Sequence, residues 1–118
     1  MITLPFPASI LAGHANGKSP WAKITATKEH RKWAAMAAAA ARYVLPDEGD
    51  ITVHITFYPP HDRGDRVNYP NRCKPYYDGI AEALGVNDKR FVPHFKFCLP
   101  DKANPRVEVM LGKAGETL

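Results

Sequence analysis

Acidic side chains bracket one helical segment near the middle of this 118-residue chain. Asp65 comes before the segment, and Asp88 comes just after the glycine that ends it. If the chain after this helix returns to the end of the β-sheet at which Asp65 lies, the two carboxylates can share one hard cation such as magnesium. This ion binds through a few carboxylate oxygens and keeps several waters. A metal held in this way activates water, so the pair is a candidate site for phosphodiester hydrolysis.

Basic side chains surround the two acids. They are Arg63, Arg66, Arg72, Lys74, Lys89 and Arg90. Lysine and arginine neutralise backbone phosphates and position a nucleic acid without reading its sequence. Aspartates that hold a metal, surrounded by lysine and arginine side chains, therefore predict hydrolysis of a nucleic-acid backbone.

The composition is that of one globular domain over residues 1–118. Hydrophobic residues make up 45% of the chain and charged residues 24%, close to the averages for soluble domains. The formal net charge of +4 permits a polyanionic partner without requiring one. No apolar run approaches the roughly 18 residues of a membrane span. We therefore expect no membrane partner and a cytoplasmic location.

Other catalytic motifs are missing from the sequence. It contains no phosphate-cradling glycine motif, no His-Glu-x-x-His, and no Ser-His-Asp order that spacing alone would support. The five histidines are scattered, so a zinc site with Cys73 or Cys98 is the weaker alternative.

The first half of the chain predicts an edge strand, a loop and a helix. Residues 2–7 alternate apolar residues with others and include two prolines, which suits a short edge strand. Loop signals fill residues 8–27, where we expect Trp21 to pack against the domain. Thr27 fits an N-cap for a helix over 28–43. Helical spacing predicts a buried stripe of Trp33, Met36, Ala40 and Val44, with His30, Arg31 and Arg42 facing outward.

The strand that precedes Asp65 has the clearest pattern in the sequence. Residues 51–58 alternate strictly, which predicts a half-buried strand with Ile51, Val53, Ile55 and Phe57 inward. Asp65 therefore follows the carboxyl end of a strand, which is a common place for functional residues.

The remaining elements follow in order. A helix should begin near Pro75 and end at Gly85. Its inward stripe should be Tyr77, Ile80, Ala81 and Leu84. Residues 91–99 alternate again, and we expect a closing strand over 106–111 to pair antiparallel with them. Residues 113–118 have the composition of a frayed tail.

The central segment resembles the RusA-like Holliday-junction resolvases of bacteria and their phages. That family typically shows an Asp-x-Asp-Asn motif after the strand, and here Asp65 matches its first aspartate and Asn68 its asparagine. Lys74 and Asp78 match the Lys-Pro-Tyr-x-Asp-Gly form found among phage members. Asp88 matches the acid in the turn beyond the helix. The resemblance extends over nearly the whole chain.

The resemblance implies an α+β fold, a small mixed β-sheet packed by two main helices, and a homodimeric working form. It implies magnesium-dependent endodeoxyribonuclease activity, with manganese as a substitute, that resolves four-way (Holliday) DNA junctions by paired nicks in recombination and repair. Such a protein acts in the cytoplasm of a bacterial or phage-infected cell. The implied catalytic residues are Asp65, Asp88 and Lys74, and the implied metal ligands are Asp65, Asp88 and, as a further candidate, Asp78. The implied DNA-binding residues are Arg63, Arg66, Asn68, Arg72, Lys74, Lys89 and Arg90.

One position departs from the family pattern. The second aspartate of Asp-x-Asp is Val67 in this chain, and a site with two carboxylates binds magnesium more weakly. The enzyme could be slow, could recruit Asp62 or Asp78, or could be inactive. Asp78 also has a simpler interpretation, an i,i+4 helix pair with Lys74. The alternative function is a catalytically weakened or inactive protein of the same fold that grips branched DNA by charge and shape.

Overall fold

The computed structural model describes residues 1–12 and 20–113. Over these residues the chain forms four strands and two α-helices. In chain order they are β1 (Ile2–Pro5), α1 (Pro20–Ala41), β2 (Ile51–Tyr58), α2 (Lys74–Leu84), β3 (Phe91–Phe97) and β4 (Arg106–Lys113). Four short 3-10 turns join them: η1 (Ser9–Leu11), η2 (Arg66–Asn68), η3 (Pro70–Cys73) and η4 (Asp88–Arg90).

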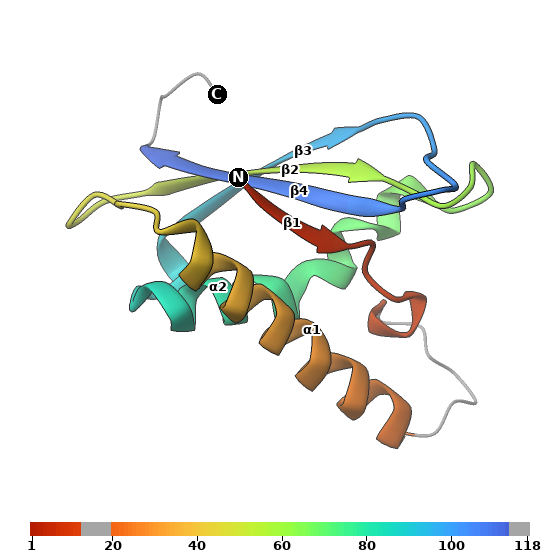
Figure 1. Cartoon of the computed structure of the whole chain (residues 1–118), viewed down its shortest axis with the longest axis horizontal. Helices are drawn as coiled ribbons and strands as arrows, with labels where there is room; N and C mark the ends of the chain where they lie inside the picture. Colours follow the sequence, from red (N-terminus) through yellow and green to blue (C-terminus); the bar gives the residue numbers. More distant parts are fainter. Residues whose placement is uncertain (13–19, 114–118) are drawn as a thin grey trace.

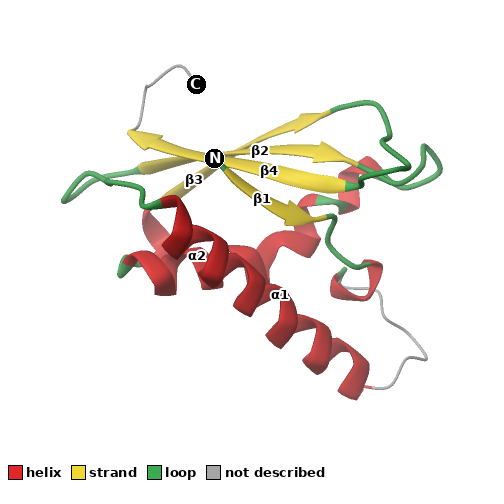
Figure 2. Cartoon of the chain, in the orientation of Figure 1, coloured by secondary structure: helices red, strands yellow, loops and turns green. Residues whose placement is uncertain are grey.

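The fold is α+β, a four-stranded mixed sheet packed against two helices (Figure 1). The strand order is β1-β4-β2-β3, so β1 is an edge strand, as the sequence predicts. Strand β4 runs antiparallel to both of its neighbours, whereas β2 and β3 are parallel. Both helices lie on one side of the sheet, and the other side carries no helix (Figure 2).

Strand β2 lies inside the sheet, and its predicted pattern is confirmed. Ile51, Val53, Ile55 and Phe57 are all buried at 2% exposure or less. They face the helices and form the core together with alternate residues of β4 and β1. The last three of these β2 residues pair across the sheet with Leu111, Val109 and Val107 of β4, which are also buried.

The predicted partner of the last strand is wrong. Strand β4 pairs with β1 and β2, and β3 pairs with β2 alone. Helix α2 connects two parallel strands, so β3 begins beside Ile51 and ends beside Phe57. The connection over residues 98–105 then carries the chain past β2 to the vacant position next to β1. A tight hairpin, which would have kept β3 and β4 together, does not form.

Helix α1 begins at Pro20 rather than near residue 28. Proline suits a first turn because its missing N–H would have no intrahelical partner there. Thr27 is therefore inside the helix instead of capping it, and its hydroxyl donates to the carbonyl of Lys23 (2.7 Å). Trp21 was expected to pack against the domain but is 73% exposed on the projecting first turn. Of the predicted loop, residues 13–19 lie outside the described residues.

The predicted buried stripe of α1 is also wrong. Trp33 and Met36 are 36% and 63% exposed, Ala40 is exposed, and Val44 lies beyond the helix at 96% exposure. The buried residues are instead His30, Ala34 and Ala38. The face of small residues packs inward because it lets the helix approach α2 closely, and the large side chains are left on the outer face.

Glycine and alanine make this close approach between the helices possible. A Cβ added at Gly79 of α2 would lie 2.2 Å from the carbonyl oxygen of Arg31 and 3.0 Å from Cβ of Ala34. An ion pair between Arg31 and Glu82 (2.7 Å) links the two helices.

Buried His30 ties α1 to the chain that leaves β1. Its Nδ1 donates to the carbonyl of Ala26 (2.7 Å), so Nε2 is free to accept the N–H of Ala8 (3.2 Å). Burial lowers the pKa of His30 below its usual 6.5. The neutral imidazole is the form that these two hydrogen bonds require.

Helix α2 ends as the sequence predicts. Gly85 caps it in the left-handed conformation (φ 67°), and the helix begins at Lys74, one residue before the predicted Pro75. Ile80 and Ala81 are buried as expected, while Tyr77 and Leu84 are only half-buried. Tyr76 is buried, and its hydroxyl donates to the carbonyl of Pro5 (2.6 Å).

The predicted tail begins too early. Lys113 belongs to β4, where its backbone pairs with Ile51. Residues 114–118 lie outside the described residues.

We expect Gly79→Ala to lower the free energy of unfolding by about 2 kcal/mol, because the added methyl group meets the backbone of α1. Helix propensity alone would favour alanine by about 1 kcal/mol, so a loss identifies the close contact. Ala83→Leu adds more volume at an exposed position of α2 and should change stability by less than about 0.5 kcal/mol. Urea unfolding of both variants measures the difference, and equal effects would contradict the packing argument.

The state of His30 predicts a loss of stability in acid. Its pKa is lowered in the folded protein, so the unfolded chain binds the proton more tightly. Stability should therefore fall as the pH drops below 6.5, until the folded-state pKa is passed. Thermal melting from pH 8 to pH 5 should show this slope in the native chain and a shallower one in His30→Gln. Identical slopes would mean that other groups cause the pH dependence.

Candidate active site

One lysine joins two carboxylates at the start of α2. The Nζ atom of Lys74 lies 2.8 Å from Oδ1 of Asp78 and 2.8 Å from Oδ2 of Asp88. Asp78 is one helical turn along α2, and Asp88 opens the η4 turn after the helix. The lysine side chain is 67% exposed and each aspartate 33%, so the cluster is open to solvent. The structure thus brings together three of the predicted site residues.

Mutual charge stabilises this cluster. Hydrogen bonding and charge from Lys74 hold the pKa of Asp88 below its usual 3.8. Its hydrogen bonds to Asp78 and Asp88 raise the pKa of Lys74 above 10.5. Lys74 and Asp88 are therefore ionised near neutral pH and attract each other.

Asp65 organises its own loop. Its Oδ1 accepts the backbone N–H of Val67 (3.0 Å) and caps the η2 turn, and its Oδ2 accepts from the Nδ2 of Asn68 (3.3 Å). These bonds fix the carboxylate at an exposed position. The side-chain amide of Asn68 is engaged in this local hydrogen bond. Val67 is 79% exposed, so its side chain plays no part in the core.

The two predicted acids lie in loops at opposite ends of the sheet. Asp65 follows the carboxyl end of β2, whereas Asp88 precedes the amino end of β3. Because these strands are parallel, the condition for a shared cation, a return across the same sheet end, is not met. In the described part of the chain, no group of three or more His, Cys, Asp or Glu side chains could hold a metal ion.

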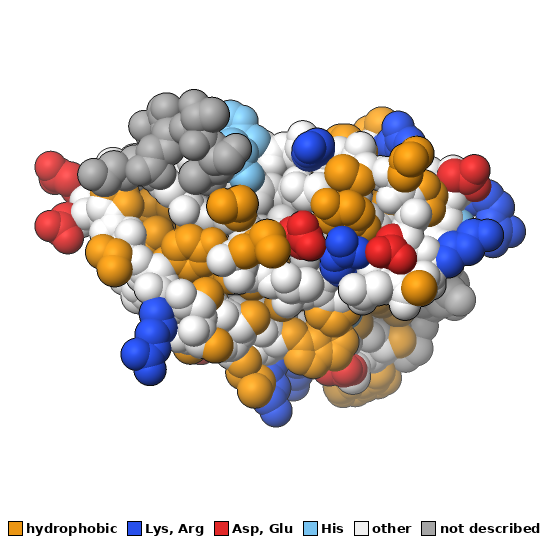
Figure 3. Space-filling model, turned by 45° about the horizontal axis from the view of Figure 1, so that its top comes forward, with side chains coloured by type: hydrophobic (Ala, Val, Ile, Leu, Met, Phe, Trp, Pro, Cys, Tyr) orange, Lys and Arg blue, Asp and Glu red, His pale blue; other side chains and the backbone are white. Residues whose placement is uncertain are grey.

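Two of the predicted DNA-binding arginines are engaged with the protein backbone. Arg72 donates to the carbonyl of Pro7 (3.2 Å), and Arg90 donates to those of Gly49 (2.7 Å) and Pro46 (2.6 Å). Arg63, Arg66 and Lys89 are exposed. The basic groups do not form one band on the open sheet side, where lysine and arginine are scattered among acidic residues (Figure 3).

A small hollow beside the lysine cluster was not predicted from the sequence. It measures about 190 Å³ and is lined by Lys74, Tyr77, Asp88, Phe91 and Pro93. The charged groups therefore have an apolar wall on one side. The i,i+4 spacing signalled the contact between Lys74 and Asp78, but only the fold could bring Asp88 and the first residues of β3 to the same place.

Carboxylate oxygens are suitable ligands for magnesium, which needs only one or two of them because it retains water. The pair Asp78 and Asp88 satisfies this requirement, and the ammonium of Lys74 already lies between them. Asp65 does not belong to a larger donor group with them. If the protein holds a magnesium ion at this cluster, Asp78 and Asp88 would supply its carboxylate ligands in place of their contact with Lys74.

Comparisons with known proteins leave the family open. No protein-family model matches the chain, and no solved structure matches it. A protein of Xylella fastidiosa, described only as an uncharacterized protein, is 41% identical to it over 98 residues. This match covers 79% of the present chain and 63% of the relative, so the chain spans less than two-thirds of that protein. Within the described residues, no helix is long and apolar enough to cross a membrane.

We expect Lys74→Met to raise the pKa of Asp88, because the hydrogen bond and charge that lower it are removed while Asp78 stays nearby. Stability from this contact exists above the unfolded-state pKa and disappears as the pH falls through the folded-state value. Carboxyl NMR titration measures the shift directly. Asp101 is the internal control, because Arg106 holds its pKa low independently of Lys74. An unchanged titration of Asp88 would show that Lys74 does not neutralise it in solution.

Proposed function

We propose that the protein is a magnesium-dependent, structure-selective endodeoxyribonuclease that cuts four-way DNA junctions. The observation that carries the proposal is the cluster of Lys74, Asp78 and Asp88, with Lys74 2.8 Å from each carboxylate. It combines two carboxylates that could ligate a hard cation with a lysine ammonium that could contact a phosphate. The net charge of +4 and the match of these residues to the RusA-like pattern support the same function.

The proposal assigns a role to each residue of the Lys74 cluster and to the exposed basic residues. Asp78 and Asp88 would hold the magnesium ion, which supplies an activated water for attack on the scissile phosphate. Lys74 would neutralise the phosphate if a cation took its place between the aspartates. Asp65 lies on another loop, where its exposed carboxylate faces solvent beside Arg66. Arg63, Arg66 and Lys89 contact the DNA backbone.

The proposed working form is a homodimer in the bacterial cytoplasm. A two-fold dimer presents two identical sites, which suits paired nicks in the two opposed strands of a nearly two-fold junction. Manganese should substitute for magnesium, because it also accepts carboxylate and water ligands.

A second candidate is a protein that binds branched DNA without cutting it. Two observations favour it. Val67 occupies the position of a family aspartate, and the described residues contain no group of three metal-ligating side chains. Its exposed lysine and arginine side chains would hold DNA by charge, and the affinity would fall steeply as the salt concentration rises.

Cleavage of a synthetic four-way junction tests both candidates against a matched linear duplex, with magnesium, with manganese and with chelator. We expect paired nicks that require metal, and a loss of about 100-fold in Asp88→Asn because one charged ligand is removed. Val67→Asp restores the family aspartate on the loop of Asp65, outside the Asp78 and Asp88 pair, so it should leave the rate unchanged if that pair holds the metal. Faster cutting would instead place the metal on the Asp65 loop. Asp47→Asn makes the same chemical change at an exposed turn and should cut normally.

The outcomes separate the candidates. Junction binding without cleavage, with cutting restored by Val67→Asp, would favour the binding protein. Equal affinity for junction and linear duplex, with no metal-dependent cutting by any variant, would contradict both.

A further inference from the structure

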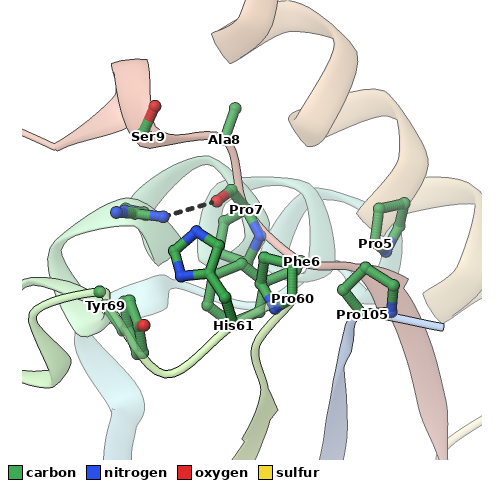
Figure 4. Close-up of a pocket in the computed structure, with 11 residues that line it drawn as sticks. Pro5, Phe6, Pro7, Ala8, Ser9, Pro60, His61, Tyr69 and Pro105 are labelled. Carbon is green, nitrogen blue, oxygen red and sulfur yellow. Dashed lines mark hydrogen bonds between the residues drawn. The ribbon is translucent and has the colours of Figure 1, made fainter. Parts of the chain in front are cut away.

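A second and larger hollow lies between the chain leaving β1 and the loop that follows β2. It has a volume of about 460 Å³. Its lining residues include four prolines together with Phe6, His61, Gly64, Tyr69 and Arg72. Segments from the two halves of the sequence meet here, and Figure 4 shows their side chains around the opening. We call this hollow the proline pocket.

Rigid groups make the walls of the proline pocket. Four of its lining residues are prolines, whose rings fix the backbone dihedral φ. Phe6 packs edge-on against Tyr69, with ring centroids 4.9 Å apart. His61 is held by its Nδ1, which accepts the N–H of Arg63 (3.3 Å). Such walls are formed before any ligand arrives, so little conformational entropy is lost on binding.

One cation lines this mostly apolar pocket. The guanidinium of Arg72 lies 5.8 Å from the ring centre of Phe6 and 5.2 Å from that of Tyr69. It donates to the carbonyl of Pro7, the bond dashed in Figure 4, while its buried Nε has no hydrogen-bond partner among the described residues. None of the lining residues is acidic. The charge of Arg72 is therefore not neutralised by a neighbouring carboxylate in the pocket.

We propose that the proline pocket binds a single unstacked nucleobase of the DNA, between its aromatic and proline walls and the guanidinium of Arg72. Flat rings gain from stacking on aromatic faces and from contact with arginine. This inference rests on the proposed function, since it names where one nucleotide of the branched DNA would sit.

The position of the pocket connects it to the loop of Asp65. Gly64 is part of the pocket wall, and Asp65 is the next residue in the chain. Arg63 flanks Gly64 on the other side. A base in the pocket therefore lies beside the loop that carries the exposed Arg63. A proline-rich peptide could use similar walls, but it offers no anion to the unneutralised Arg72 and its basic neighbours.

NMR titration of the full chain tests the proposal with four probes: deoxyadenosine monophosphate, deoxyribose phosphate, inorganic phosphate and a proline-rich peptide. We expect the nucleotide alone to shift the amide signals of Phe6, His61 and Gly64 strongly. Its affinity should fall about fivefold or more in His61→Ala, which removes one flat wall. His94→Ala removes the same side chain from the outer sheet face and should bind normally.

Each other result would overturn the inference. If inorganic phosphate shifts the same signals as strongly, the pocket is an anion site. If the peptide binds more tightly than the nucleotide, it is a peptide site. If His61→Ala and His94→Ala bind the nucleotide equally, the base lies elsewhere. Nucleotide binding does not depend on cleavage, so a failed pocket leaves the nuclease proposal standing, and a failed nuclease assay leaves the pocket testable.

Discussion

The parallel pairing of β2 with β3 is the constraint on which the rest of this structure depends. Two parallel neighbours need a crossover, so the chain after β2 must travel back along the sheet before β3 can start. Helix α2 lies within that crossover, and the turn with Asp88 follows its end. The same path turns Asp88 back toward the first residue of α2, where Lys74 meets it. The crossover thus puts Asp65 after the carboxyl end of β2 and Asp88 before the amino end of β3, where the side chain of Lys74 reaches it.

The two helices must then share one face of a small sheet, which is why their contact is so close. Gly79 against the backbone of α1 leaves no room for a side chain, and the buried alanines of α1 bring the helices together. This narrow pair does not cover the whole face. Phe95 and Phe97 of the edge strand β3 remain 40% and 38% exposed on the helix side. The hollow beside Lys74 opens along the first residues of this partly covered strand.

Local sequence patterns correctly predicted the features that depend only on neighbouring residues. Strict alternation defined β2, and a glycine that must adopt positive φ marked the end of α2. The buried face of α1 could not be predicted in the same way, because size usually signals burial and here close packing selected alanine over Trp33 and Met36. Pairing of β4 and the arrival of Asp88 at Lys74 depend on topology, which spacing along the chain does not encode. The same holds for the contact of Arg72 with Pro7, 65 residues away.

Charge limits what the cluster around Lys74 can do. Two carboxylates that share a neighbour repel each other unless a cation lies between them, and in this structure that cation is the ammonium group. Lys74 and a divalent ion would compete for the same position, since both need the same carboxylate oxygens. The lysine is long, flexible and 67% exposed, so it can swing out without disturbing the core. In the proposed function, the displaced ammonium would stay near the aspartates and meet the incoming phosphate. Under that proposal, Lys74 would hold the two carboxylates together without metal and would become a phosphate-binding group when a divalent ion displaces it.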